Sequence, residues 1–364
     1  MTSGSGRVAR WINPVIRSMQ AYHVPDASGL IKLDAMENPY HLPDTTRTAW
    51  LKALGHAAIN RYPDPGAGAL KSSIRRVLSV PDSQGVILGN GSDEIIQMII
   101  MAVAAKDRCV LAPEPGFVMY RVIAEILGLE YAGVPLDPDF NLDMAAMLAA
   151  IDLHQPAVIF MATPNNPTGN RFDRDAVLQI VEAAPGLVVI DEAYFIFTDD
   201  SFMQDLECFE HLLVMRTLSK LGLAGLRVGF LAGPQAWLQE FDKLRLPYNI
   251  NVLSQLSAEF FLEHYHPLQE QAARIVQDRE EMYAALGNLA GIEVFPSEAN
   301  FLLIRCRDHP ADEVHQALRE QGILVKNLHG SQAQLDQCLR VTVGSAVENR
   351  TFLDALSGIL AGNS

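Results

Sequence analysis

Short runs of consecutive apolar residues alternate with longer helical patterns between about residue 86 and residue 233. These runs begin at Val86, Cys109, Ala157, Leu187, Leu212 and Val228. Apolar and polar residues do not alternate within the runs, which is typical of strands buried on both faces of a sheet. Strands separated by helices predict parallel crossover connections and an α/β sheet covered by helices on both sides.

The pattern changes after about residue 251. A long helical pattern covers residues 254–289. It is followed by apolar runs at 301–306, 323–326 and 339–343, and by helical patterns at about 313–320 and 347–360. This order predicts a second, smaller α+β domain.

The first 45 residues contain four prolines and no long periodic segment, so we expect an arm laid over the body of the protein. The chain is therefore divided into an N-terminal arm (1–45), a large α/β domain (46–253) and a small C-terminal α+β domain (254–364).

Composition and charge exclude several classes of protein. The 364 residues are 49% hydrophobic and 20% charged, as in an ordinary globular protein. The net charge of −15 and the lack of a basic stretch argue against a nucleic-acid partner. The most apolar helical stretch, 95–105, is shorter than the ~18 residues of a membrane span, and no secretory signal precedes it. The four cysteines form no Cys-x-x-Cys pair. We therefore expect a cytoplasmic protein that binds no metal and no membrane.

Two motifs that suit ligand binding follow predicted strands, at the sheet edge where α/β proteins bind ligands. Residues 89–94 end a strand and begin a helix, so free backbone N–H groups and the Ser92 hydroxyl suit a phosphate. An ordinary helix N-cap at Ser92 or Asp93 explains that motif equally well. In residues 163–169, two prolines fix the backbone beside the amide of Asn166, although a plain turn uses the same residue types.

Two further motifs carry charged side chains. Asp191 ends an apolar run, so its carboxylate lies at the mouth of a buried strand and needs a cationic partner. Lys220 lies in a loop of small and hydroxyl residues, and Arg227 follows seven residues later. A lysine can bond to a carbonyl carbon, a buried aspartate can hold a pyridine nitrogen protonated, and Ser, Thr and Arg can hold a phosphate.

Together these motifs resemble a known family. NNPTG at 165–169, DEAY at 191–194 and RTLSK at 216–220 resemble the signature of the fold-type I, pyridoxal-phosphate-dependent aminotransferases. Five more segments narrow the resemblance to the histidinol-phosphate aminotransferases over nearly the whole chain: AYHVP at 21–25, IKLDAMENPY at 31–40, RYPDP at 61–65, ILVKNL at 323–328 and LRVTVGS at 339–345. The resemblance implies pyridoxal phosphate as cofactor, and a mostly parallel sheet flanked by helices in the large domain.

The resemblance also implies roles for individual residues around the cofactor. Lys220 is the catalytic lysine that bonds to the cofactor and moves protons, and Asp191 pairs with the ring nitrogen. Asn166 and Tyr194 hydrogen-bond the ring hydroxyl, and Phe117 stacks on the ring. The cofactor phosphate is held by Gly91, Ser92, Asp93, Thr217, Ser219 and Arg227.

Further residues are implied for the substrate and for a second subunit. Tyr62 reaches the cofactor phosphate of a neighbouring subunit, which implies a homodimer with shared active sites. Tyr22, Asn38, Lys326 and Arg340 hold the substrate. Four positions depart from the family: Met36 replaces the usual Asn, His41 the usual Gly, Phe117 the usual Tyr and Lys326 the usual Arg. Phe keeps the stacking face without the hydroxyl, and Lys keeps the charge without the bidentate fork.

The implied reaction moves an amino group between L-histidinol phosphate and 2-oxoglutarate, and yields imidazole-acetol phosphate and L-glutamate in L-histidine biosynthesis. It is reversible and ping-pong. An aromatic amino-acid aminotransferase would share every cofactor motif, and a threonine-phosphate decarboxylase-like lyase would also bind a phosphorylated amine. A regulatory domain without activity is disfavoured, because Lys220, Asp191 and Asn166 are all present.

Overall fold

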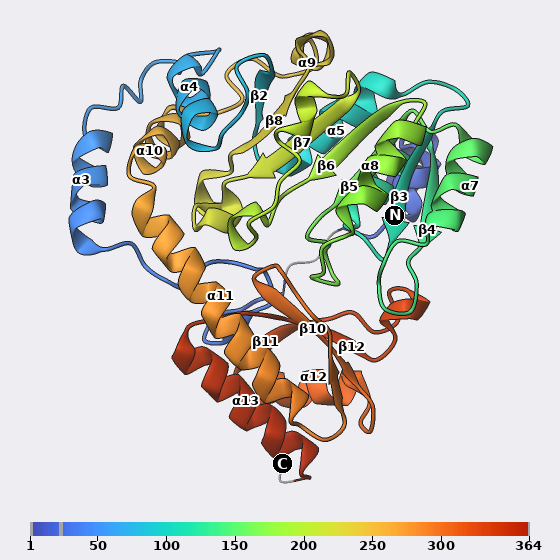
Figure 1. Cartoon of the computed structure of the whole chain (residues 1–364), viewed down its shortest axis with the longest axis vertical. Helices are drawn as coiled ribbons and strands as arrows, with labels where there is room; N and C mark the ends of the chain where they lie inside the picture. The colour runs from blue at the N-terminus through green and yellow to red at the C-terminus, as the bar shows by residue number, and fades with distance from the viewer. Residues whose placement is uncertain (1–2, 22–24, 363–364) are drawn as a thin grey trace.

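The computed structural model describes residues 3–21 and 25–362, and their strands form two sheets (Figure 1). The larger sheet has the order β2-β8-β7-β6-β5-β3-β4. Its strands are β2 (Gly85–Gly89), β3 (Cys109–Glu114), β4 (Glu130–Pro135), β5 (Val158–Ala162), β6 (Leu187–Asp191), β7 (Leu212–Thr217) and β8 (Gly229–Gly233). The strands β4, β3, β5, β6 and β7 run parallel, and β8 is antiparallel to both β7 and β2. The predicted mostly parallel sheet is confirmed.

Helices cover both faces of this sheet. The helices of this part are α3 (Asp44–Leu54), which packs on α10, and α4 (Gly68–Val77), α5 (Ser92–Val103), α6 (Met119–Ile126), α7 (Met144–His154), α8 (Arg174–Ala183), α9 (Gln235–Asp242) and α10 (Val252–Glu263). Consecutive residues of β6 enter two different cores, because side chains of a strand alternate between its faces. Val188 lies in the same core as Val177 of α8, whereas Val189 lies in the same core as Ile95 of α5. Burial on both sides explains the continuous apolar runs.

The smaller sheet has the order β1-β11-β12-β10-β9. Its strands are β1 (Ile31–Leu33), β9 (Ile292–Val294), β10 (Phe301–Cys306), β11 (Ile323–Asn327) and β12 (Cys338–Thr342). It packs with α11 (His266–Gly287), α12 (Ala311–Glu320) and α13 (Ala346–Leu360). Strand β1 comes from the expected arm and pairs in parallel with β11, Ile31 opposite Ile323. A strand of three residues is too short to show a pattern in the sequence.

Short helices complete the described chain. They are α1 (Ser3–Trp11), α2 (Pro14–Ser18), and the 3-10 turns η1 (Phe195–Phe197), η2 (Asp205–Glu207), η3 (Ser219–Leu221), η4 (Ala224–Leu226) and η5 (Ala333–Leu335). The helices α1 and α2 were not expected in the arm. Strand β4 was also missed, because its sequence, EYAGVP, contains no continuous apolar run.

The long helical pattern at 254–289 is two helices rather than one. Helix α10 ends at Glu263 and α11 begins at His266, with Pro267 in its first turn. Proline is favoured there because its missing N–H has no helical acceptor at that position. Helix α10 packs against α3 and α4, so the boundary expected between residues 253 and 254 falls inside a helix of the large part.

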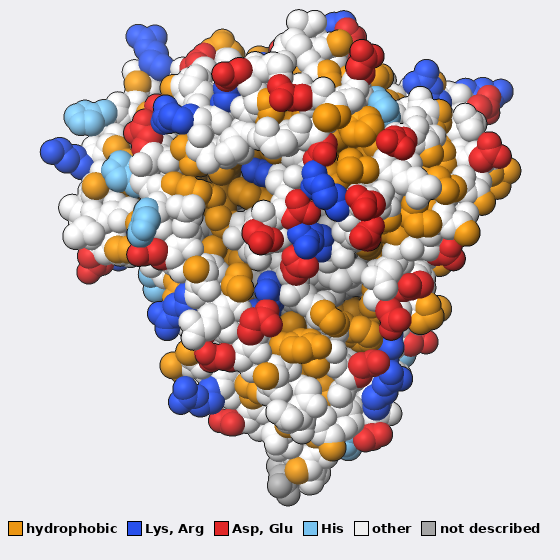
Figure 2. All heavy atoms as spheres, in the orientation of Figure 1, with side chains coloured by type: hydrophobic (Ala, Val, Ile, Leu, Met, Phe, Trp, Pro, Cys, Tyr) orange, Lys and Arg blue, Asp and Glu red, His pale blue; other side chains and the backbone are white. Residues whose placement is uncertain are grey.

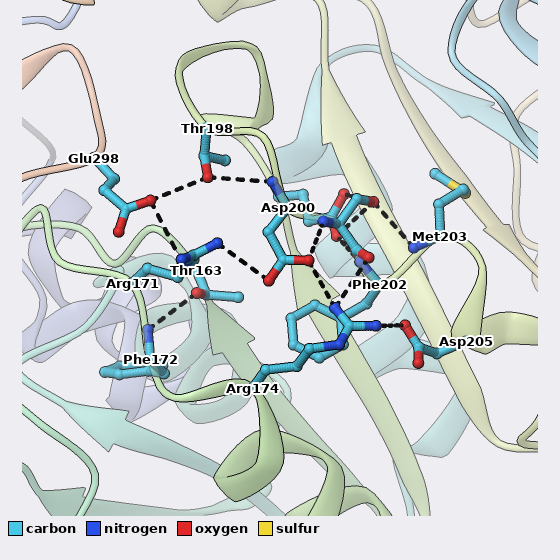
Figure 3. Close-up of polar contacts among 12 residues, drawn as sticks. Thr163, Arg171, Phe172, Arg174, Thr198, Asp200, Phe202, Met203, Asp205 and Glu298 are labelled. Atoms are coloured by element: carbon cyan, nitrogen blue, oxygen red, sulfur yellow. Dashed lines mark hydrogen bonds and ion pairs between the residues drawn. The ribbon is translucent and has the colours of Figure 1, made fainter.

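Polar contacts join the two parts where the loop before β10 meets the large sheet (Figure 3). The backbone N–H of Glu298 donates to the carbonyl of Gly169 over 2.7 Å. The Glu298 carboxylate accepts a hydrogen bond from Thr198 (3.1 Å) and pairs with Arg171 (3.4 Å). Figure 3 also shows Arg174 beside this cluster, directed at two carboxylates of the large part. The loop at 165–169 is thereby fixed against the small sheet.

The surface shows no extended patch of one charge on the face drawn in Figure 2, where basic side chains lie singly or in small groups among acidic ones. Within residues 3–21 and 25–362, no helix combines the length and the apolar character that a membrane crossing requires.

Candidate active site

A cavity of about 400 Å³ lies at the carboxyl ends of β5, β6 and β7, beside the start of α5. It brings together most of the residues predicted to bind the cofactor. These are Ser92, Asp93, Phe117, Asn166, Asp191, Tyr194, Thr217, Ser219, Lys220 and Arg227. They come from six separate segments of the chain and meet because parallel strands end at one edge of the sheet.

Lys220 lies in η3, directly after β7, and its amine faces this cavity. Burial and, next, the nearby charge of Arg340 lower the pKa of the Lys220 amine to about 8. The Nζ atom lies 5.8 Å from the ring centroid of Tyr194. A buried amine with this pKa is partly neutral near pH 8, so it can act as a nucleophile and as a base.

Asp191 ends β6, and its carboxylate is buried at the floor of the cavity. Tyr120 donates a hydrogen bond to Oδ2 (2.7 Å), and the backbone N–H of Ala193 donates to Oδ1 (3.1 Å). Both of these partners are neutral, and burial raises the pKa of Asp191 to about 6. The cationic partner expected from the sequence is therefore not supplied by these hydrogen bonds, and a cation bound in the cavity would complete the site.

The opposite end of the cavity is built for an anion. Helix α5 has Gly91 as its N-cap, and no side chain caps its first N–H groups. Ser92 is thus not the N-cap, which removes the simpler explanation of this motif. Gly91 has a φ of +82°, and a Cβ there would lie 2.5 Å from Nη2 of Arg227. Free N–H groups at a helix start, a hydroxyl and a guanidinium are groups that suit a phosphate.

The hydroxyl groups of this end are linked to Arg227. Arg227 Nη1 donates to Ser219 Oγ over 3.2 Å, and Thr217 Oγ1 donates to the same oxygen over 3.0 Å. The Arg227 guanidinium also lies 3.7 Å from the Asp93 carboxylate. Arg227 has a φ of +51°, so the backbone turns sharply just before β8.

A second cavity of about 720 Å³ adjoins the first and shares Met36, Phe117 and Asn166 with it. Its lining includes three cationic side chains, of which Arg121 of α6 pairs with Glu114. The other two, Lys326 of β11 and Arg340 of β12, are direct neighbours across the two antiparallel strands. The predicted substrate residues Lys326 and Arg340 therefore lie together, next to the cavity that holds Lys220.

Comparison with known proteins agrees with this geometry. Residues 28–356 match the family Aminotransferase class I and II. The chain belongs to this family.

Its relatives narrow the assignment within the aminotransferases. Histidinol-phosphate aminotransferase 2 of Nitrosococcus oceani is 55% identical over 350 residues, covering 96% of this chain and 97% of the relative. Histidinol-phosphate aminotransferase 1 of Ralstonia nicotianae is 51% identical over 358 residues, covering 97% of this chain and 95% of the relative. The chain is thus a member of the histidinol-phosphate aminotransferases.

Solved structures share the fold of this aminotransferase at lower identity. Histidinol-phosphate aminotransferase from Sinorhizobium meliloti, in complex with pyridoxal-5'-phosphate, has a TM-score of 0.86 at 23% identity, covering 97% of this chain and 98% of that chain. L-threonine-O-3-phosphate decarboxylase from Porphyromonas gingivalis has a TM-score of 0.79 at 22% identity, covering 91% of this chain and 100% of that chain. The fold alone therefore does not separate transamination from decarboxylation.

Pyridoxal phosphate is the cofactor of this aminotransferase, and the first cavity fits it. The buried amine of Lys220 suits the aldehyde carbon, and Asp191, with two neutral donors, suits a protonated ring nitrogen. The uncapped start of α5 and Arg227 suit the phosphate. The aldehyde, the ring nitrogen and the phosphate of the cofactor thus each have a matching group at the cavity.

Other predicted residues of the aminotransferase lie outside both cavities. Asn38 donates to Gln271 of α11 (2.9 Å) and accepts from the Tyr40 backbone (2.8 Å), so it holds its own segment on α11. Tyr62 is 80% exposed and stacks on Tyr248 with ring centroids 4.4 Å apart. Tyr22 lies outside the described residues.

The sequence reasoning missed three contributors to the site. Tyr120 holds Asp191 from α6, three residues after Phe117, so a search of the same segment for a buried hydroxyl would have found it. The backbone carbonyls of Ala35 and Met36 accept hydrogen bonds from Lys220. Backbone groups carry no residue-specific signal, so only the fold shows them.

Proposed function

We propose that this aminotransferase moves the amino group of L-histidinol phosphate to 2-oxoglutarate, and so forms imidazole-acetol phosphate and L-glutamate reversibly. The proposal places the enzyme in L-histidine biosynthesis in the cytoplasm. It is supported by relatives at 55% and 51% identity that are named for this activity.

The observation that carries the proposal is the pair of cations beside the Lys220 cavity. Arg340 and Lys326 line one cavity, and Asn166, Met36 and Phe117 connect it to the buried amine. A substrate with an amine and an anionic group a few bonds away fits both ends at once. A phosphate monoester and a dicarboxylate both satisfy this description, because a guanidinium binds either oxyanion bidentately.

The described residues divide the work of the reaction. Pyridoxal phosphate, when bound, draws electrons from the Cα–H bond of the substrate and so makes that proton removable. The neutral amine of Lys220 takes the proton from the substrate Cα and then donates it at the cofactor's C4′. Asp191 keeps the ring nitrogen protonated, because at neutral pH its carboxyl is mostly ionised. Arg227 and Ser219 hold the phosphate, and Phe117 covers the ring.

A single-turnover measurement tests the substrate. The holoenzyme is mixed with L-histidinol phosphate in the absence of any keto acid, and the visible spectrum of the cofactor is followed. We expect conversion to the amine form, with one equivalent of keto product and no carbon dioxide. Conversion by L-phenylalanine alone would favour an aromatic aminotransferase, and carbon dioxide from L-threonine phosphate would favour the decarboxylase.

We also propose that two copies of the chain form a homodimer in which Tyr62 serves the partner subunit's active site. Tyr62 lines neither cavity of its own chain and projects to solvent. Other large apolar side chains are exposed too: Leu51, Ile59, Leu246, Tyr248 and Leu253. Exposed apolar groups of this kind are favoured at interfaces.

Hybrid dimers test the shared site. Lys220→Ala and Tyr62→Ala chains, each of low activity alone, are mixed under conditions that exchange subunits. If Tyr62 acts in trans, one site of each hybrid has both Lys220 and the partner's Tyr62, so activity returns. If activity stays at the sum of the two parents while hybrids are detected by mass, Tyr62 does not act in the partner.

A further inference from the structure

The amine of Lys220 rests on two backbone carbonyl groups of a distant segment. Its Nζ donates to the carbonyl of Met36 (3.3 Å) and to that of Ala35 (3.4 Å). This segment follows β1, which belongs to the small sheet, whereas Lys220 follows β7 of the large sheet. The contact therefore joins the catalytic lysine to the other part of the protein.

The backbone at Met36 is held in an uncommon conformation. Its φ is +54°, in the left-handed region that side chains other than Gly, Asn and Asp rarely adopt. Two residues of the small sheet region hold it there. Thr342 Oγ1 accepts a hydrogen bond from the Met36 N–H (3.0 Å), and Asn300 Nδ2 donates to the Met36 carbonyl (3.0 Å). Strained backbone persists where surrounding contacts determine it, and such strain is concentrated at functional sites.

Asn300 and Thr342 are both buried, so their side chains contact Met36 rather than solvent. Asn300 is fully buried, and Thr342 is 3% exposed at the end of β12. Arg340, two residues earlier on β12, donates to the carbonyl of Asp34 over 3.0 Å. The backbone groups of Asp34 and Met36, on either side of Ala35, are thus tied to residues of the small sheet region.

The chemistry of this contact suits a temporary position for the amine. Carbonyl oxygens accept hydrogen bonds, so they favour the ammonium form, which has three donors. Both distances are long compared with the usual 2.9–3.0 Å, so the hold is weak. A weak hold fits a group that must leave to reach the substrate.

We propose that the carbonyl groups of Ala35 and Met36 are a docking site for the Lys220 amine whenever that amine is not bonded to the cofactor, and that Asn300 and Thr342 are positioning residues for this site. The proposal rests on the catalytic role of Lys220 in the proposed function, but not on the identity of the amine substrate. The docked amine is protonated and held away from the substrate, and the neutral amine leaves the site to take the Cα proton.

Competitive acetylation tests the docking site in the intact enzyme. The holoenzyme is converted to its amine form with L-glutamate, and a trace of acetic anhydride is added across a pH series. Mass spectrometry then gives the acetylation rate of Lys220 relative to the exposed Lys243 in the same sample. The matched variants are Thr342→Val, which removes the acceptor for Met36, and Thr342→Ser, which keeps it.

In Thr342→Val we expect the pKa of Lys220 to fall by about one unit from about 8, so that Lys220 acetylates about fivefold faster at pH 7. Thr342→Ser is expected to behave as wild type. Equal rates in wild type and Thr342→Val, with the amine form produced normally, would overturn the docking site. Failure of L-glutamate to convert the cofactor would instead contradict the proposed function, so the two failures are distinguishable.

A second measurement needs no variant. A crystal structure of wild-type enzyme in its amine form is expected to show Lys220 Nζ within about 3.5 Å of both carbonyl oxygens. An amine hydrogen-bonded elsewhere, with residues 34–36 unchanged, would overturn the proposal even if Thr342→Val failed to fold.

Discussion

The guanidinium of Arg340 donates a hydrogen bond to Oδ1 of Asn166 over 2.5 Å. This bond joins β12 of the small sheet to the loop that follows β5 of the large sheet. Arg340 also lines the second cavity and lowers the pKa of Lys220. One side chain thus connects the second cavity, the loop at 165–169 and the buried amine of Lys220.

Replacement of Arg340 should weaken both half-reactions. Arg340→Ala removes charged hydrogen bonds that are each worth about 1.5–3 kcal/mol, so we expect single-turnover rates at low substrate to fall about 10- to 150-fold. The loss should be similar with L-histidinol phosphate and with 2-oxoglutarate. A loss confined to one of them would show that the two anions bind at different residues.

Replacement of Arg340 should also change the pH dependence of the single-turnover rate. Lys220 must be neutral to take a proton, so the rate rises with pH through its pKa of about 8. Because the charge of Arg340 lowers that pKa, Arg340→Ala should move the rising limb to higher pH. Arg340→Lys keeps the charge and should leave the limb in place while the affinity falls. Identical pH profiles for wild type and Arg340→Ala would contradict the electrostatic link.

Asp191→Asn should have opposite effects on the cofactor-free and cofactor-bound protein. Burial raises the pKa of Asp191 from 3.8 to about 6, so the native state binds this proton more tightly than the unfolded chain does. Its contribution to stability therefore falls as pH rises from about 4 to 6. At pH 7 the cofactor-free variant should be more stable, by on the order of 2–3 kcal/mol in urea unfolding, and at pH 3 no more stable. The cofactor-bound variant should lose affinity for the cationic ring.

A glycine pair tests the phosphate end. In Gly91→Ala the new Cβ would lie 2.5 Å from the Arg227 guanidinium at a φ of +82°, so Arg227 must move. We expect the dissociation constant of pyridoxal phosphate to rise at least about tenfold, as measured by equilibrium dialysis. Gly225 lines the same cavity, and a Cβ there meets nothing within 4 Å, so Gly225→Ala is the control. Equal affinities in the two variants would argue against the phosphate site.

Loss of the catalytic amine should abolish turnover without preventing cofactor binding. Lys220→Ala keeps Asp191, Arg227 and Ser219, so it should still bind pyridoxal phosphate non-covalently. Its rate should fall at least about 10²- to 10⁴-fold, the usual contribution of a positioned base. Added methylamine should restore part of the rate if the missing function is proton transfer. Turnover like that of wild type would refute the role of Lys220.

The sequence by itself determined the main architecture and the first cavity. The runs at 157–162, 187–190 and 212–215 are apolar throughout because both faces of these strands are covered, so the parallel sheet could be predicted. Asp191 ends the second of these strands, Asn166 and Lys220 lie in the loops after the other two, and the ends of neighbouring parallel strands meet at one edge. The position of each residue at or just after a predicted strand was therefore enough to predict that these residues lie close together.

Only the tertiary structure decided the contacts between segments far apart in the chain. The three residues of β1 join the small sheet through hydrogen bonds to β11, and no pattern of side chains encodes that choice. The docking of Lys220 on Met36, and the hold of Thr342 on the same residue, use backbone groups that are alike in every residue. The packing of the two sheets selects these partners. A buried backbone N–H or C=O group needs a hydrogen-bond partner, and the fold decides which partner lies within reach.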